Sequence, residues 1–376
     1  MPDRPVYIND YRLNCCLGNH SDQWFDKLSQ QPDYRKTNAQ QQYRYIDTDI
    51  NIPHRIFRFL KQQIDELLGA STSTIEPART QVFIGSTSYD IRDLEQRVEG
   101  AGDQEETNQR IYQQMKPLDL VANQLCDTFG FHRESYSFNT ACTSSANALL
   151  YAARMITLGL LDDALVIGAE VFNYTSLRGF QSLGLLTQTQ FNPFSRTRDG
   201  MQLGEGVSVI HLSNRAQNNS TIRLLGGAGS TDTFNVSTTN PDGSEIARTI
   251  NLALADAGIS SGMIKAIKAH GTATLNNDDA EANGLKRIFS NDIPPVFVYK
   301  PHIGHTLGGC GGNELVLFCE SLKNGVFPCT SDRFEYDPEL AITINPSVNH
   351  KINGPVLLNY FGFGGSNCSL VLSYDA

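Results

Sequence analysis

Short runs of apolar residues recur along the chain, and longer segments with helical periodicity separate them. A run of four to eight apolar residues is typical of a buried strand, and apolar positions spaced three and four apart are typical of a helix. The predicted strands are Gln81–Gly85, Ala164–Gly168, Lys265–Ala269, Val296–Val298 and Pro355–Asn359. Their alternation with helices predicts an α/β protein with a buried, mixed or parallel sheet.

Two of the helical segments are clearly bounded. One covers Ser145–Leu158 and stops at Gly159, and the other covers Ile246–Ala257 and stops at Gly258. Glycine ends a helix readily because it adopts the left-handed conformation without strain.

A polar segment rich in Asn and Ser, Ser213–Thr221, interrupts the pattern near the middle of the chain. The strand-like segments Gly206–Ser213 and Gly365–Ser373 have similar endings, one before this break and one at the C-terminus. We therefore predict a duplicated βαβ architecture with an N-terminal half over residues 1–215 and a C-terminal half over residues 216–376.

Composition narrows the class of protein. The chain has 376 residues, 40% of them hydrophobic, and 30 basic against 40 acidic side chains give a net charge of −10. This excludes a disordered chain and argues against nucleic acid as a partner. The most apolar stretch, Ala146–Leu161, is interrupted by Arg154, so no membrane span is expected.

Targeting and redox signals point to the cytoplasm. The first residues, Met1–Pro5, lack the charged leader and apolar core of a signal peptide. The eight cysteines lack the dense spacing of a disulfide scaffold, which fits a reducing compartment. We expect a cytoplasmic protein.

The first candidate for chemistry is Cys142, which directly precedes an Ala- and Leu-rich helical segment. A helix N-terminus offers free N–H groups and a partial positive charge, and both favour a thiolate over a thiol. The sequence thus predicts a reactive cysteine. The alternative is a small buried residue in a tight turn.

A second cluster follows a predicted strand and contains His270, Thr272 and Thr274, with Asp278 and Glu281 in the next helical stretch. A histidine at a strand end, followed by glycine and small hydroxyl residues, is well placed to face a pocket. The alternatives are a structural histidine and a helix-capping arrangement of Asp278 with Glu281.

A third cluster, also after a strand, contains Lys300, His302, His305 and Cys310 among many glycines. The spacing is poor for a metal cage, so we expect no metal. The glycines either let the backbone approach a substrate or allow tight packing of a helix. A fourth cluster, Phe361–Asn367, has the same two interpretations.

Together the four clusters resemble the β-ketoacyl synthase family of condensing enzymes, which have the thiolase fold. The family order is a nucleophilic Cys, then His-Gly-Thr-x-Thr, then Lys-x-x-x-Gly-His-Thr, then Gly-Phe-Gly-Gly-Ser-Asn, and this chain follows it. The segment Phe194–Gly200 also looks like the one after the family's active-site helix. The resemblance implies two duplicated βαβαβ-type halves in a five-layer α-β-α-β-α arrangement.

The resemblance also implies residue roles. Cys142 would be the nucleophile that accepts the acyl group, and His270 and His305 would promote decarboxylation of the malonyl group and stabilise the enolate. Lys300 would hold Glu281 and order the histidine loops. The reaction implied is a decarboxylative Claisen condensation with malonyl-acyl carrier protein, in fatty acid, polyketide or polyene chain elongation.

Further roles follow from the same resemblance. The backbone N–H groups of Cys142 and Phe363 would form the oxyanion hole, and Phe363 would gate the acyl pocket. Thr272 and Thr274 would bond the phosphopantetheine arm. The full set expected to bind substrate is Thr272, Thr274, Phe361, Phe363 and Ser366.

The implied partner is acyl carrier protein, which brings the phosphopantetheine, so no cofactor of the chain's own is expected. A carrier of this kind is strongly acidic, and Arg55, Arg58 and Lys61 on a predicted helix offer a local basic surface for it. The alternative is a merely solvated basic face. A homodimer, or a heterodimer with a second ketosynthase-like subunit, is also implied.

Two competing assignments concern relatives of the synthases. A thiolase would use a second active-site cysteine where this chain has histidines. A catalytically silent partner similar to the chain-length factors usually lacks the nucleophile, which this chain retains. The chain is also shorter than usual synthases, and Thr143, His302 and Cys310 depart from the family pattern, which leaves the acyl preference open.

Overall fold

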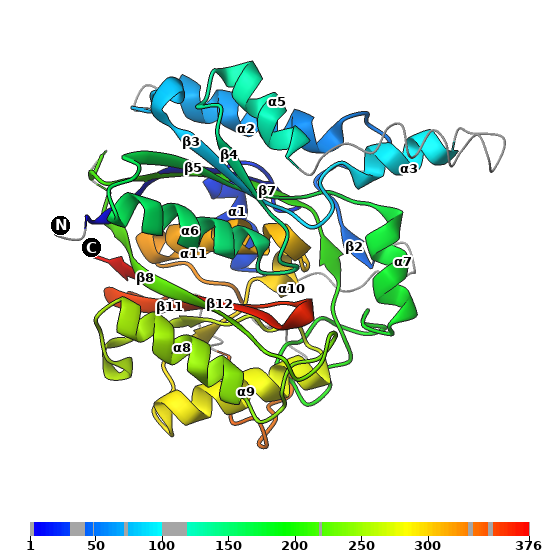
Figure 1. The fold of residues 1–376 in the computed structure, drawn as a ribbon. Helices are drawn as coiled ribbons and strands as arrows, with labels where there is room; N and C mark the ends of the chain where they lie inside the picture. Colours follow the sequence, from blue (N-terminus) through cyan, green and yellow to red (C-terminus); the bar gives the residue numbers. More distant parts are fainter. Residues whose placement is uncertain are drawn as a thin grey trace.

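The computed structural model describes residues 4–30, 42–47, 49–70, 74–99, 119–217, 220–329, 334–344 and 349–375. Helices and strands alternate along them (Figure 1). The strands are β1 (Val6–Cys15), β2 (Tyr43–Arg44), β3 (Gln81–Gly85), β4 (Ser135–Phe138), β5 (Asp163–Glu170), β6 (Leu203–Gly204), β7 (Gly206–Ser213), β8 (Ile222–Thr231), β9 (Ile267–Lys268), β10 (Val296–Phe297), β11 (Gly354–Phe361) and β12 (Ser366–Tyr374).

The α-helices of the described residues are, in chain order, α1 (Ser21–Leu28), α2 (Arg55–Gly69), α3 (Ile91–Glu99), α5 (Leu120–Phe129), α6 (Ser144–Thr157), α7 (Tyr174–Ser182), α8 (Ser244–Asp256), α9 (Leu275–Phe289), α10 (Lys300–Ile303) and α11 (Cys310–Asn324). The predicted helices match α6 and α8 to within two residues at each end. The predicted strand Lys265–Ala269 forms ladder pairs only over Ile267–Lys268, because the chain turns into the His270 loop at once.

One ten-stranded sheet runs through the described residues, in the order β10-β9-β11-β12-β8-β1-β7-β5-β3-β4. Each half of the chain supplies five strands. In both halves the second, third and fourth strands in chain order (β3, β4 and β5; β9, β10 and β11) pair in parallel, and the first and fifth strands pair antiparallel. The strands β7 and β12, which contain the similar sequence segments, hold equivalent places, so the predicted duplication is confirmed.

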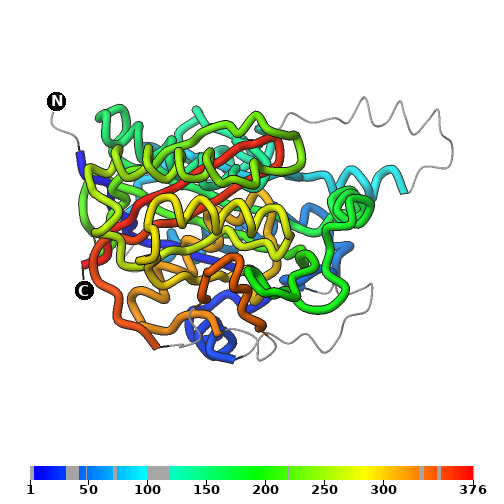
Figure 2. The backbone as a smooth tube through the Cα atoms, turned by 90° about the horizontal axis from the view of Figure 1, so that it is seen from below, coloured from blue at the N-terminus to red at the C-terminus, as the bar shows by residue number. Residues whose placement is uncertain are grey.

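The two half-sheets meet at β1 and β8, which form only two residue pairs, Val6 with Leu224 and Tyr7 with Arg223. The chain crosses from one half-sheet to the other between Ser213 and Ile222. The break predicted from the polar segment lies there. Figure 2 shows the start of β1 and the end of β12 on the same side of the molecule.

The layers stack as Figure 1 shows. Helices α2 and α5 cover one half-sheet, α6 and α11 lie between the two half-sheets, and α8 and α9 cover the other. Three apolar clusters fill the spaces between these layers. The five-layer arrangement and the α/β class are thus confirmed. No helix among the described residues is long and apolar enough to span a bilayer.

The middle layer is packed backbone against backbone. A Cβ added to Gly311 would lie 2.2 Å from the amide nitrogen of Ala146, and one added to Gly308 would lie 2.5 Å from that of Thr87. Real Cβ atoms do not come so close, so α11 can approach α6 only with glycine at position 311, and the turn before α11 can approach the loop after β3 only with glycine at position 308. This packing sets the distance between Cys142, which precedes α6, and His305, which precedes α11.

Candidate active site

Cys142 sits on a strained turn just before α6. The preceding Ala141 has a positive φ of 51°, and Thr143 forms the N-cap of the helix, which begins at Ser144. A non-glycine residue in the left-handed region costs about 1–3 kcal/mol and persists where the surroundings enforce it. Here the amide of Ser144 donates to the carbonyl of Ala141 at 3.1 Å and closes the turn.

The sulfur of Cys142 lies 3.1 Å from Nε2 of His305. Cys142 is buried, and burial raises the pKa of its thiol to about 12, although Lys300 and the backbone amides of Phe363 and Cys142 act in the opposite direction. The prediction that the helix start makes this sulfur anionic is therefore wrong for the resting protein. A thiolate needs water or strong partners, and the desolvation of the site outweighs the helix end.

His305 is the nearest base for that thiol proton. Burial is the main cause that lowers the pKa of His305 well below its usual range, with help from Lys300 and Lys268, so its ring is neutral. Its backbone is clamped to the short strand β6: its amide donates to Gln202 at 2.7 Å, and its carbonyl accepts from Gly204 at 3.0 Å. The ring is thus held in place and remains free to take up a proton.

His270 is fixed on three sides. Its amide donates to Oε1 of Glu281 at 2.8 Å, and the ammonium of Lys300 lies 2.6 Å from its carbonyl oxygen and 3.3 Å from its Nδ1. Burial, then Lys300, lowers the pKa of His270 well below its usual range. Because Lys300 donates to Nδ1, the ring proton lies on Nε2, which faces the cavity.

The expected contact of Lys300 with Glu281 is wrong. Lys300 forms its ion pair with Glu314 of α11, at 2.6 Å, and Lys268 forms a second one with the other oxygen of Glu314, at 2.7 Å. Glu281 instead accepts from the amides of His270 and Gly271, at 2.8 and 2.9 Å. Glu281 thus shapes the histidine loop directly, with no ion pair to Lys300.

The helix-capping interpretation of Asp278 is also wrong. Helix α9 begins at Leu275 with Thr274 as N-cap, so Asp278 and Glu281 lie inside the helix. The carboxylate of Asp278 accepts from the amides of Phe194 and Thr272, at 2.7 and 3.1 Å. Burial raises the pKa of Asp278 to about 6 and that of Glu281 to about 7.

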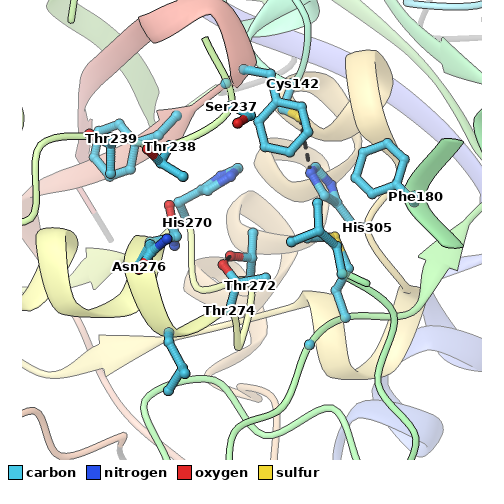
Figure 3. A pocket seen from close by; sticks show the side chains of 18 of the residues that line it. Cys142, Phe180, Ser237, Thr238, Thr239, His270, Thr272, Thr274, Asn276 and His305 are labelled. Atoms are coloured by element: carbon cyan, nitrogen blue, oxygen red, sulfur yellow. Dashed lines mark hydrogen bonds between the residues drawn. The ribbon is translucent and has the colours of Figure 1, made fainter. Parts of the chain in front are cut away.

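A cavity of about 290 Å³ opens over the three reactive side chains. Cys142, His270 and His305 point toward one another at one end of it (Figure 3), and the rings of the two histidines are 5.5 Å apart. Thr272 and Thr274, whose hydroxyl groups are 2.9 Å apart, form one wall. The structure therefore brings together side chains that come from both halves of the sequence.

Aromatic rings line the same cavity. Phe361 meets the ring of His270 edge to face with 5.7 Å between centroids, and Phe363 stacks on Phe180 at the same separation. Ser366, which we expected to bind substrate, is not among the residues that line the cavity. Its hydroxyl lies 2.7 Å from that of Thr143 and so ties the last strand to the start of α6.

The basic surface on α2 is smaller than expected. Arg55 is buried and binds both oxygens of Glu205, at 2.8 and 2.7 Å, so it cannot dock a partner. Arg58 and Lys61 are exposed, and Lys61 pairs with Asp65 at 2.6 Å. Arg55 and Lys61 are six residues apart, so their side chains lie about 120° apart around the helix axis. That angle is enough to place Lys61 on the exposed face and Arg55 on the buried one.

The two departures in the third cluster have structural partners. His302 lies 3.0 Å from the carbonyl of Cys329, and burial lowers its pKa to about 4. The thiol of Cys310 donates to the carbonyl of Cys142 at 2.9 Å. Among the residues that the structure describes, no group of three or more metal-ligating side chains is found.

Several residues of the site escaped the sequence analysis: Lys268, Glu170, Glu314, Phe180 and Ser237–Thr239. Glu170 accepts from Thr87, Ser88 and Gly308, so it ties the loop after β3 to the turn before α11. Two of these residues leave a signal in the sequence: Lys268 is a charge inside an apolar strand, and Glu314 is a charge inside an apolar helix. Such charges are rarely buried without a partner.

Comparison with known proteins assigns the family. The profile described as "Beta-ketoacyl synthase, N-terminal domain" matches residues 54–218, and the one described as "Beta-ketoacyl synthase, C-terminal domain" matches residues 223–332. The chain belongs to the β-ketoacyl synthase family, within the thiolase superfamily, as the four sequence clusters predict.

Two curated relatives illustrate the similarity. A chloroplastic 3-oxoacyl-[acyl-carrier-protein] synthase I of Hordeum vulgare is 31% identical over 65% of this chain and 56% of its own length. A 3-oxoacyl-[acyl-carrier-protein] synthase 2 of Vibrio cholerae is 30% identical over 68% of this chain and 66% of its own length. The chain thus matches between half and two thirds of the length of these relatives.

Solved structures agree over nearly the whole chain. A chain of the complex between a ketosynthase and its chain length factor from Xenorhabdus doucetiae is 27% identical, with a TM-score of 0.80 and coverage of 99% of this chain and 98% of that one. A chain of the ishigamide ketosynthase/chain length factor, 22% identical, has the same fold, with a TM-score of 0.84 and full coverage of both chains.

Proposed function

We propose that this protein is a β-ketoacyl synthase that catalyses decarboxylative Claisen condensation between an acyl group held on Cys142 and a malonyl group on acyl carrier protein. The observation that carries the proposal is the meeting of Cys142, His270 and His305 at one end of one cavity, with 3.1 Å between the sulfur and Nε2 of His305. A nucleophile within hydrogen-bond reach of a base is the arrangement that covalent catalysis requires.

In the first half-reaction Cys142 attacks the carbonyl carbon of an acyl thioester. The thiol proton passes to Nε2 of His305 and then to the departing carrier thiolate, so the sulfur needs to be anionic only during the attack. The amides of Phe363 and Cys142 reach the sulfur, so they also lie where an oxyanion forms beside it. The acyl group ends as a thioester on Cys142.

In the second half-reaction a malonyl thioester loses carbon dioxide. The electron pair of the broken bond forms an enolate, whose oxygen accepts hydrogen bonds from Nε2–H of His270 and from His305 in the tautomer that carries its proton on Nε2. The enolate carbon attacks the acyl carbon on Cys142, the bond between that carbon and the sulfur breaks, and the thiolate of Cys142 takes up a proton from water. A positive charge on the histidines is not required, which fits their neutral state.

The remaining walls of the cavity suit a linear polar arm that carries an acyl chain. Hydroxyl groups of Thr272, Thr274 and Ser237–Thr239 would bond the amides of phosphopantetheine, and Phe361 and Phe363 would contact its thioester end. Phe363, stacked on Phe180, would act as the gate to the acyl pocket. The arm arrives on the carrier, so no cofactor of the chain's own is needed.

Partners follow from the same assignment. Acyl carrier protein would meet the exposed residues Arg58 and Lys61, and a second ketosynthase-like subunit would complete a homodimer or heterodimer. The similarity to a chain from a complex of a ketosynthase with its chain length factor favours such pairing. A chain-length-factor-like role is the second candidate, and the retained Cys142, His270 and His305 argue against it. The cytoplasmic location stays a prediction.

The test is acylation of the purified protein. On incubation with an acyl-carrier thioester we expect one acyl adduct on Cys142 by intact mass, and release of a 3-oxoacyl product once malonyl-carrier protein is added. Cys142→Ala should lose condensation by at least about 10³-fold while some malonyl decarboxylation remains. No adduct, with activity only after a second subunit is supplied, would favour the chain-length-factor role.

A further inference from the structure

A fully buried ammonium group belongs to Lys268, two residues before His270. Lys268, the last residue of β9, has no exposed surface. Its Nζ donates to Oε2 of Glu314 at 2.7 Å and to the carbonyl of Asn359 at 2.6 Å, and it lies 3.6 Å from the centre of the Tyr360 ring. Three partners for three N–H bonds make this a site built for an ammonium group.

Lys300 binds the same carboxylate from the other side. Its Nζ lies 2.6 Å from Oε1 of Glu314, 2.6 Å from the carbonyl of His270 and 3.3 Å from Nδ1 of His270. Glu314 is therefore divided between two lysines. Lys268 donates an N–H bond to Oε2 of Glu314, whereas Lys300 meets Oε1 as an ion pair and directs its N–H bonds to His270.

We propose that Lys268 is a positioning residue of the active site, because its ammonium occupies one oxygen of Glu314 and so leaves Lys300 free to hold His270. If Oε2 of Glu314 lost Lys268, it would be a buried anionic oxygen without a partner, which is strongly unfavourable. The carboxylate would then turn both oxygens to Lys300, and Lys300 would leave Nδ1 of His270. The proposal rests on the proposed function for the reaction that this positioning serves.

The second ammonium also opposes protonation of the two imidazoles. The other titratable groups that face this cluster are Cys142 before α6, Asp278 and Glu281 of α9, Tyr299 before α10, Cys310, Glu314 and Cys319 of α11, Tyr360 of β11 and Cys368 of β12. Burial lowers the pKa of Lys268 to about 8, so its charge is present at neutral pH. Removal of that charge makes protonation of His270 and His305 easier, whichever of the neighbouring acids is ionised.

The test is nuclear magnetic resonance of protein labelled with ¹⁵N-histidine, which reports ring tautomer and protonation without any substrate. In the wild type we expect His270 to carry its proton on Nε2 and to stay neutral below pH 6. In Lys268→Met and Lys268→Gln we expect a mixture of tautomers and a titration midpoint higher by about one unit. His270→Gln assigns the signal, and Lys265→Met, an exposed lysine three residues earlier, is the matched control.

A folded Lys268→Met or Lys268→Gln with the wild-type tautomer and titration would overturn the proposal. If neither variant folds, ¹⁵N-lysine-labelled wild type decides: an ammonium signal of Lys268 at pH 7 that disappears above pH 8 supports the proposal, and a neutral amine at pH 7 overturns it. Steady-state kinetics of malonyl decarboxylation test whether this positioning affects the reaction. We expect kcat of malonyl decarboxylation at pH 6 to fall about tenfold in Lys268→Met, with KM little changed.

These readouts separate the two ideas. If the histidine signals change as expected but the wild type condenses nothing, the positioning role stands and the proposed function fails. If the wild type condenses and neither Lys268 variant alters the histidine signals, the function stands and the positioning role fails.

Discussion

The two halves of the molecule have the same strand connections but carry different chemistry. The N-terminal half supplies Cys142, the proposed nucleophile, and a buried carboxylate, Glu170, whose partners are hydroxyl and amide groups. The C-terminal half supplies both imidazoles and a buried carboxylate, Glu314, whose partners are two ammonium groups. We call Glu170 with its hydroxyl and amide partners the uncharged support, and Glu314 with its two ammonium partners the charged support. The same arrangement of strands thus holds a different kind of buried cluster in each half.

The difference shows how catalysis divides between the halves. The uncharged support around Glu170 fixes loops, and the charged support around Glu314 sets the tautomer and the neutral state of the histidines. We therefore expect substitutions in the charged support to act on the reaction, and substitutions in the shared middle layer to act on stability.

The largest effect should come from Lys300→Met. The variant removes the donor to Nδ1 and to the carbonyl of His270, so His270 loses its fixed tautomer. We expect kcat for malonyl decarboxylation to fall by about 10²-fold or more, because misplaced acid–base groups lose most of their effect. Lys265→Met is the control. A kcat near that of the wild type would mean that the charged support is not needed for the chemistry.

Acid stability should be sensitive to His302. Its pKa is about 4 in the folded chain, against about 6.5 when unfolded, so the unfolded state binds the extra proton between these values. His302 thus takes away up to about 3 kcal/mol of the free energy of unfolding as pH falls from 6.5 to 4. In His302→Gln we expect a shallower loss over that window in urea titrations at several pH values. His132→Gln, on an exposed side chain, is the matched control, and equal slopes in His302→Gln and the wild type would contradict the assignment.

Stability should fall next in Gly311→Ala. The new methyl group would lie 2.2 Å from the amide nitrogen of Ala146, so α6 and α11 must move apart. Overpacking of this kind costs about 1–3 kcal/mol, measurable by chemical denaturation. Gly179→Ala in α7, where the added Cβ meets nothing within 4 Å, should be neutral or slightly stabilising. If both variants unfold alike, the middle layer is looser than the structure indicates.

The smallest effect concerns the outer helices of the two halves. Arg58→Glu with Lys61→Glu on α2 should raise KM for acyl carrier protein several-fold, and less at high salt, because surface charges mainly steer association. KM for a small pantetheine thioester should not change. Arg248→Glu on the exposed side of α8 is the control in the other half. An equal rise in KM for carrier and pantetheine thioester would contradict carrier docking on α2.

The sequence predicts the class of fold and the three side chains that meet at the cavity, because each of these leaves a local signal. Strands and helices follow from apolar spacing, and Cys142, His270 and His305 stand in ordered motifs beside glycines. Partners across the middle layer leave no such signal. Lys300 pairs with Glu314 because of the way α11 packs against the active site. The sequence around Lys300 does not reveal which carboxylate will be its partner.

Two other errors have equally physical causes. Arg55 is on the buried side of α2 because the helical phase carries it there, although its charge favours exposure. The state of the Cys142 thiol depends on how completely the folded chain removes water, and a position at a helix start does not reveal that. Both errors concern the surroundings of a side chain, which only the packed structure defines.

The seam between the two half-sheets consists of two residue pairs. Strand hydrogen bonding there is too short to hold the sulfur and the imidazoles in register, so the task falls to helices α6 and α11. Substitutions along that helical contact are therefore expected to change the distance between Cys142 and the two histidines while those three side chains stay the same.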